Sequence, residues 1–162
     1  MKRLICISLL LAILTGCGAS VPSSKNTIHF YYPRQAFHYA SSDGSMGMES
    51  RELTDWSDDL NYMIHLYLLG PQEDTLTSIF PKSTRLLSSE MVEDSLIISL
   101  SPVDNALSDI QYTFAAACLA RTCLGIVPAQ SVTIRSGDRE ITLTTDNMLL
   151  MDDSATLETE EK

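Results

Sequence analysis

The period of hydrophobic and polar positions changes several times along this chain, and the changes divide it into short elements. Six segments are rich in β-branched, aromatic or alternating apolar residues, which is typical of strands: 27–32, 48–53, 84–92, 96–101, 132–135 and 141–145. Two longer segments, 55–69 and 108–124, repeat their apolar residues at the 3.6-residue period of a helix. The order predicts an α+β fold, a mixed sheet of about six strands with two helices packed on one face.

Both predicted helices have recognisable ends. Asp55 stands where it can cap the first helix, and Gly70-Pro71 follows its last turn, because glycine suits that position and proline cannot continue a helix. In the second helix Ser108 and Gln111 have the spacing of a capping box. This second helix is apolar on nearly all sides, so we expect it to be buried or to lend one face to a partner.

One stripe of the second helix is the candidate partner-binding face. It contains Tyr112, Leu119 and Cys123 at helical spacing. If this face binds a partner, Leu119→Asp should abolish partner capture and leave the domain folded.

The same helix carries two cysteines, Cys118 and Cys123. Two positions that are five residues apart on a helix have their Cα atoms about 8.5 Å from each other, whereas a disulfide tolerates a Cα–Cα distance of at most about 7 Å. A disulfide therefore requires the helix to end near Thr122. The alternative is that both cysteines are small core residues.

The beginning of the chain is organised differently. Two positive charges precede an apolar run at 4–14, and the sequence LTGC at 14–17 closes it. This is the layout of a secretory signal peptide, and its end resembles the lipobox of bacterial lipoproteins. The resemblance implies that 1–16 is removed and that Cys17 carries covalent diacylglycerol and an acyl chain such as palmitate. The alternative is a membrane helix that is not cleaved. As a helix the apolar run would span only about 16 Å, which is too short for the roughly 30 Å of hydrocarbon in a bilayer.

These features predict four regions and a location. We expect a signal peptide at 1–16, a lipidated tether at 17–26, one domain at 27–145 and an acidic flexible tail at 146–162. The protein should lie outside the cytoplasm, anchored by its lipid to the bacterial cell membrane. Its formal net charge of −10 repels phosphate backbones, so nucleic acid is not an expected partner.

The chain carries no recognisable catalytic motif, and we do not expect an enzyme. Its histidines, His29, His38 and His65, fall in separate predicted elements, and no cysteine or histidine spacing suggests a metal. His65 is expected on the surface rather than as a ligand. No cofactor is expected apart from the lipid on Cys17.

Aromatic residues near the first strand suggest an alternative function. Side chains of this kind can stack on sugar rings, which would make the chain a binding protein for cell-wall glycan or another small ligand. The candidates are Tyr31, Tyr32, Phe37 and Tyr39. Packing of these aromatics in the core is the competing interpretation.

Several short runs resemble a known family, the GerMN domain of sporulation and spore-germination lipoproteins. They are FYY at 30–32, YLLGP at 67–71, LTSIFPKSTRLLS at 76–88, QYTF at 111–114 and SVTI at 131–134. The resemblance spans about 27–145 and implies a small α+β domain without known catalytic residues, similar in shape to modules that pack side by side in envelope complexes. We therefore expect a lipid-anchored, non-catalytic interaction or scaffold module of the cell envelope, in a sporulation or germination assembly, with a protein partner or self-association.

Overall fold

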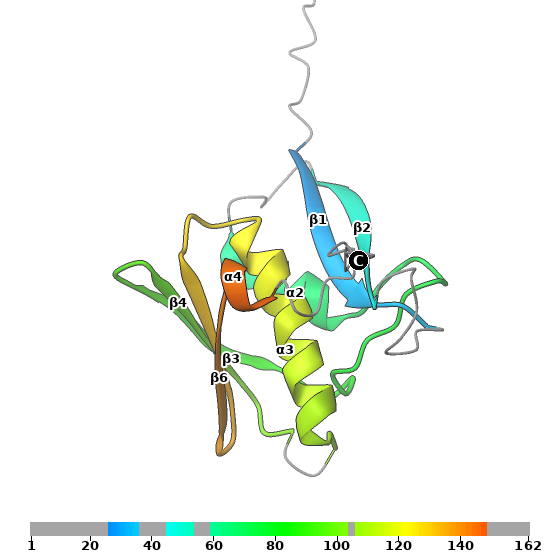
Figure 1. Ribbon diagram of the computed structural model, residues 1–162. Coiled ribbons are helices and arrows are strands. Elements are labelled where there is room, and N and C mark those ends of the chain that lie inside the picture. The colour runs from blue at the N-terminus through cyan, green and yellow to red at the C-terminus, as the bar shows by residue number, and fades with distance from the viewer. Residues whose placement is uncertain (1–25, 36–44, 54–58, 104–105, 149–162) are drawn as a thin grey trace, which may run out of the picture.

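The computed structural model describes residues 26–35, 45–53, 59–103 and 106–148. Within these ranges the six strands and the two longer helices follow the predicted order, which confirms the α+β class (Figure 1), and a short helix at 145–148 follows the last strand where the sequence predicted a flexible tail from 146. The elements are β1 (Asn26–Pro33), β2 (Met46–Leu53), α2 (Leu60–Leu68), β3 (Leu86–Val92), β4 (Ser95–Leu100), α3 (Asp109–Leu124), β5 (Ser131–Ser136), β6 (Arg139–Thr144) and α4 (Thr145–Met148). The predicted signal peptide with Cys17, and the segment 149–162, lie outside the described residues.

The six strands form two sheets where the sequence predicted one. β1 and β2 make an antiparallel hairpin, and the other four pair in the order β3-β4-β5-β6. Only β4 and β5 run parallel among these pairs, because α3 makes the long crossover between them that parallel neighbours need. α3 contacts β1 of the hairpin as well as β5 and β6, so it lies between the two sheets (Figure 1).

The inner face of the four-stranded sheet explains the alternation seen in the sequence. Leu96, Ile98 and Leu100 of β4 are fully buried, while the residues between them are partly exposed. The hydroxyl of Tyr112 on α3 donates a hydrogen bond of 3.0 Å to the carbonyl of Ile134 on β5. The sheet therefore holds α3 by apolar packing and by one buried polar contact.

The helix ends agree with the sequence except at the start of α2. This helix begins at Leu60 with Asp59 as its cap, whose carboxylate accepts a 3.1 Å hydrogen bond from the Tyr62 amide. The predicted cap, Asp55, lies outside the described residues. Gly70 follows the helix with a φ of +96°, a conformation that favours glycine. The capping box of α3 is present as predicted.

The predicted partner-binding face of α3 is wrong. Tyr112, Leu119 and Cys123 are buried, and Leu119 has no exposed surface at all. The reason is the position of α3 between the β1–β2 hairpin and the four-stranded sheet, which covers the helix on both sides. An apolar pattern around the whole helix here reflects burial and not a docking surface.

The two cysteines of α3 are free thiols in the core. The helix continues past Thr122 to Leu124, so the condition for a disulfide is not met. Burial raises the pKa of Cys123 to about 12, and it raises the pKa of Cys118 against the lowering effect of Arg121.

We expect both thiols to be almost inert in the folded protein. Alkylation needs the thiolate, and a pKa raised from 9.0 to about 12 leaves Cys123 with about 1,000-fold less of it at neutral pH. Peptide-level mass spectrometry after iodoacetamide treatment should show Cys118 and Cys123 unlabelled in buffer and fully labelled in denaturant. Equal labelling rates in the two conditions would contradict their burial.

Candidate functional site

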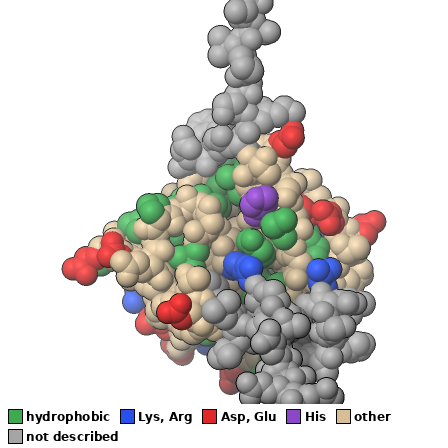
Figure 2. Space-filling view, turned by 45° about the horizontal axis from the view of Figure 1, so that its top comes forward, with side chains coloured by type: hydrophobic (Ala, Val, Ile, Leu, Met, Phe, Trp, Pro, Cys, Tyr) green, Lys and Arg blue, Asp and Glu red, His purple; other side chains and the backbone are tan. Residues whose placement is uncertain are grey.

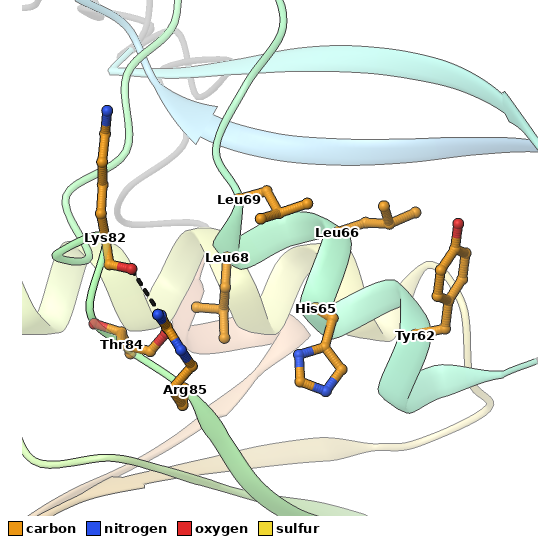
Figure 3. Close-up of a pocket in the computed structure, with 8 residues that line it drawn as sticks. All are labelled: Tyr62, His65, Leu66, Leu68, Leu69, Lys82, Thr84 and Arg85. Atoms are coloured by element: carbon orange, nitrogen blue, oxygen red, sulfur yellow. Dashed lines mark hydrogen bonds between the residues drawn. The ribbon is translucent and has the colours of Figure 1, made fainter.

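A hollow lies between α2 and the loop that leads to β3. We call it the α2–loop pocket, and its volume is about 500 Å³. Figure 3 shows the loop residues facing the C-terminal end of α2, with the rest of the helix extending away from them. Its lining consists of Tyr62, His65, Leu66, Leu68, Leu69, Lys82, Thr84 and Arg85.

The helical period of α2 places one side of the helix in this pocket. Met63, Ile64 and Tyr67 are buried in the core. Of the pocket residues on α2, Tyr62 and His65 are exposed, whereas Leu66 and Leu68 are partly buried against the core. At the end of the helix Leu69 is 80% exposed. An exposed leucine inside a hollow is available for contact with an apolar group.

The loop side of the pocket is held by its own hydrogen bonds. The Thr84 amide donates to the Pro81 carbonyl at 2.9 Å. The Arg85 guanidinium donates hydrogen bonds to the carbonyl of Lys82 at 2.7 Å and to the carbonyl of Thr84 at 2.9 Å. Figure 3 draws the first of these bonds as a dashed line. The Thr84 hydroxyl is buried beside the pocket without a hydrogen-bond partner. This part of the lining is therefore preformed and polar.

The charge of the pocket is opposite to that of the chain. Lys82 and Arg85 line it together with His65, and none of the eight lining residues is acidic. In Figure 2 acidic side chains lie around the outline of one face, and hydrophobic ones are dispersed in small groups. Three other described arginines have carboxylate partners: Arg51 with Glu49, Arg135 with Glu140 and Arg139 with Asp109. The pocket thus combines apolar surface with positive charge that faces solvent.

A buried ion pair fixes the end of α2 and was not anticipated from the sequence. Glu49 and Arg51 on β2 are both buried and bonded to each other. The Glu49 carboxylate also accepts hydrogen bonds from the backbone amides of Gln72 at 2.6 Å and Glu73 at 2.9 Å. The Arg51 guanidinium donates a hydrogen bond to the Gly70 carbonyl at 2.9 Å. These bonds tie the hairpin to the turn after Leu69. Two charged residues in a short strand predict side chains that face solvent. No local signal in the sequence could therefore have identified this pair as buried.

The aromatic residues proposed for glycan binding do not form an open platform in the described part of the chain. Tyr32 is fully buried, stacked on Tyr67 at 4.6 Å between ring centroids, and its hydroxyl donates to the Tyr67 carbonyl. Its assignment to a sugar site is wrong, because the side chain is enclosed in the core and has no exposed surface. Tyr31 is half-buried under the Arg121 guanidinium. Phe37 and Tyr39 lie outside the described residues.

The remaining candidate residues are separate from one another. His29 bonds Ser50 across the hairpin at 3.0 Å, and His65 is exposed in the pocket. His38 lies outside the described residues. Nowhere in the described ranges do three histidine, cysteine, aspartate or glutamate side chains gather as metal ligands. None of the helices described is long and apolar enough to cross a membrane.

The fold can be compared with that of known proteins. No protein-family model matches the chain, and no curated protein does. Among solved structures, it is similar to the tandem GerMN domains of the sporulation protein GerM from Bacillus subtilis, with 13% identity and a TM-score of 0.52 over 76% of this chain and 43% of that one. It is also similar to a "putative lipoprotein" from Clostridium perfringens, with 19% identity and a TM-score of 0.47 over 79% of this chain and 93% of that one.

The likeness to the GerMN domains defines a class by fold. The chain has a GerMN-like fold, and at 13% identity the comparison extends no further than the fold. The chain spans less than half of the tandem GerM structure.

Proposed function

We propose that this chain is a non-catalytic docking module of the bacterial cell envelope, anchored by lipid on Cys17, that binds through the α2–loop pocket. The observation that carries the docking role is the pocket itself, which exposed Leu69 lines together with Lys82 and Arg85 on an otherwise acidic chain. Its lining supplies apolar and cationic contacts but no paired nucleophile and carboxylate base. Such a surface suits binding better than catalysis.

Two further observations support the cellular setting that we propose. The first 17 residues have the charge, apolar run and cysteine of a lipoprotein signal. The GerMN-like fold is shared with a protein named for sporulation. We therefore place the module in a sporulation or germination assembly outside the membrane, where two acyl chains suffice for stable anchoring.

The anchor is tested by replacing its attachment point. In cells fed a radiolabelled fatty acid, we expect the full chain to take up label and to sediment with membranes. The Cys17→Ser variant should lose the label, because a hydroxyl does not replace the thiol in the alkylation. Absence of label in the unchanged protein would contradict the lipid anchor.

The docking role is tested with two matched variants of the full chain. Leu69→Gln removes exposed apolar surface inside the pocket, and Ile110→Gln removes it on α3, where Ile110 is 64% exposed. Burial of a leucine is worth about 1.5–3 kcal/mol, so Leu69→Gln should reduce the yield of in-cell crosslinked adducts about tenfold or more. Ile110→Gln should leave it unchanged. Equal yields from both variants would contradict docking at this pocket.

A further inference from the structure

The α2–loop pocket specifies the chemistry of its occupant. Leucine side chains and Tyr62 offer an apolar floor, while Lys82 and Arg85 give the rim a positive character. A matching ligand would be a short peptide with adjacent aliphatic and acidic residues. Because charge complementarity steers encounter and suppresses wrong partners, a basic or neutral apolar peptide fits this pocket less well.

This chain itself contains such a peptide outside the described residues. Segment 149–162 begins with Leu149, Leu150 and Met151, continues with Asp152 and Asp153, and carries three further glutamates against one lysine. Its apolar start corresponds to the leucine floor of the pocket, and its acids correspond to the rim. The function proposed above does not use this segment.

The end of α4, where segment 149–162 begins, lies in a different part of the fold from the α2–loop pocket. Segment 149–162 follows α4, which contacts β6 and α3, whereas α2 contacts β3. β3 and β6 are the two opposite edges of the four-stranded sheet. α2 also contacts α3, so α3 lies between the donor end and the pocket of one molecule. A contact that joins the β6 edge of one copy to the β3 edge of the next avoids this obstacle.

We infer that residues 149–162 of one copy dock in the α2–loop pocket of a second copy. The inference rests on the docking role of the pocket proposed above and names its occupant. Such a contact joins two different surfaces, so it is heterologous and can extend from copy to copy along a membrane. The lipid anchor would favour the contact by keeping the copies at high local concentration.

Peptide binding to the full chain tests the chemistry of this contact. The probe is a fluorescent peptide of residues 149–162, and its control has the five acids replaced by their amides. We expect the acidic peptide to bind about tenfold more tightly, and Lys82→Glu to weaken it by about tenfold, as close interfacial charge pairs do. Arg34→Glu, an equal charge change at an exposed residue that does not line the pocket, should leave binding unchanged. Equal affinity for the two peptides would overturn the inference.

Photo-crosslinking tests the geometry and separates this inference from the docking role. The full chain carries Leu69→p-benzoylphenylalanine, and nitrogen-14 and nitrogen-15 copies are mixed before illumination. We expect adducts of two chains in which residue 69 of one isotope is joined to 149–162 of the other. Crosslinks within one chain would overturn docking between copies. No adduct between copies would overturn the occupant named here and leave the docking role to the in-cell crosslinking of the Leu69→Gln variant.

Discussion

Leu119→Asp is expected to unfold the domain, although the sequence alone suggested that it would only disable a surface. Leu119 has no exposed surface, and α3 is covered by β1 on one side and by β5 and β6 on the other. An aspartate there would lose the apolar packing of leucine, which costs about 2–5 kcal/mol, and would add an unpaired buried carboxylate. The sum is comparable with the whole stability of a small domain, about 5–15 kcal/mol.

Circular dichroism and urea denaturation of the full chain measure this outcome. The matched control is Ile110→Asp, which places the same carboxylate on the exposed first turn of the same helix, where a negative charge is favourable. We expect Ile110→Asp to keep a cooperative transition near that of the unchanged chain. A folded Leu119→Asp protein that fails to bind its partner would instead restore the surface role of α3.

Glu49→Ala is expected to cost about 3–5 kcal/mol, because it removes one member of a buried ion pair and leaves Arg51 without its carboxylate. The amides of Gln72 and Glu73 lose their acceptor as well. The turn after α2 would loosen, and the α2–loop pocket with it. Urea denaturation should show the loss, and Glu90→Ala, at an exposed glutamate of β3, should change stability by less than about 0.5 kcal/mol. A Glu49→Ala loss as small as that of the control would show that the pair is not structural.

The same glutamate predicts a pH dependence. Burial alone would raise the pKa of Glu49, but hydrogen bonds from the Glu73 amide, the Arg51 guanidinium and the Gln72 amide outweigh burial and hold the pKa below its usual 4.5. A carboxyl group with a lowered pKa in the folded state stabilises it above the unfolded pKa, and this contribution is lost as the pH falls. We therefore expect the free energy of unfolding to drop as the pH falls below about 4.5. Glu49→Gln should show a smaller drop over that range, and an identical drop would assign the effect to other acids.

Local patterns predicted the elements well because each depends on near neighbours. The alternation in β4 marks which of its residues face the core. Gly70 and the Ser108–Gln111 capping box mark helix ends through bonds and backbone angles within a few residues. The start of α2 differed because Asp55 and Asp59 both suit the cap position, and only the packed helix selects Asp59.

Functional assignments failed where they depended on what lies opposite a residue. The apolar pattern of α3 was compatible with burial on both sides and with a partner-binding face, and Leu119 has the same neighbours in sequence in either case. Tyr32 was likewise compatible with a sugar platform or with the core. The pocket was not anticipated, because it brings α2 together with the loop at Lys82 and Arg85.

The sequence by itself determined the order of strands and helices, their approximate bounds, the acidic charge of the chain and the GerMN-like character of the fold. The order, the bounds and the charge follow from periodicity, capping and composition, whereas the GerMN-like character follows from the resemblance of several short runs to that family. Only the tertiary structure decided that the strands form two sheets, that α3 is enclosed between them, that Glu49 and Arg51 are buried and that a basic, apolar pocket remains open beside α2. The physical reason is that burial depends on which distant segments pack together, and a residue's neighbours along the chain do not specify that packing.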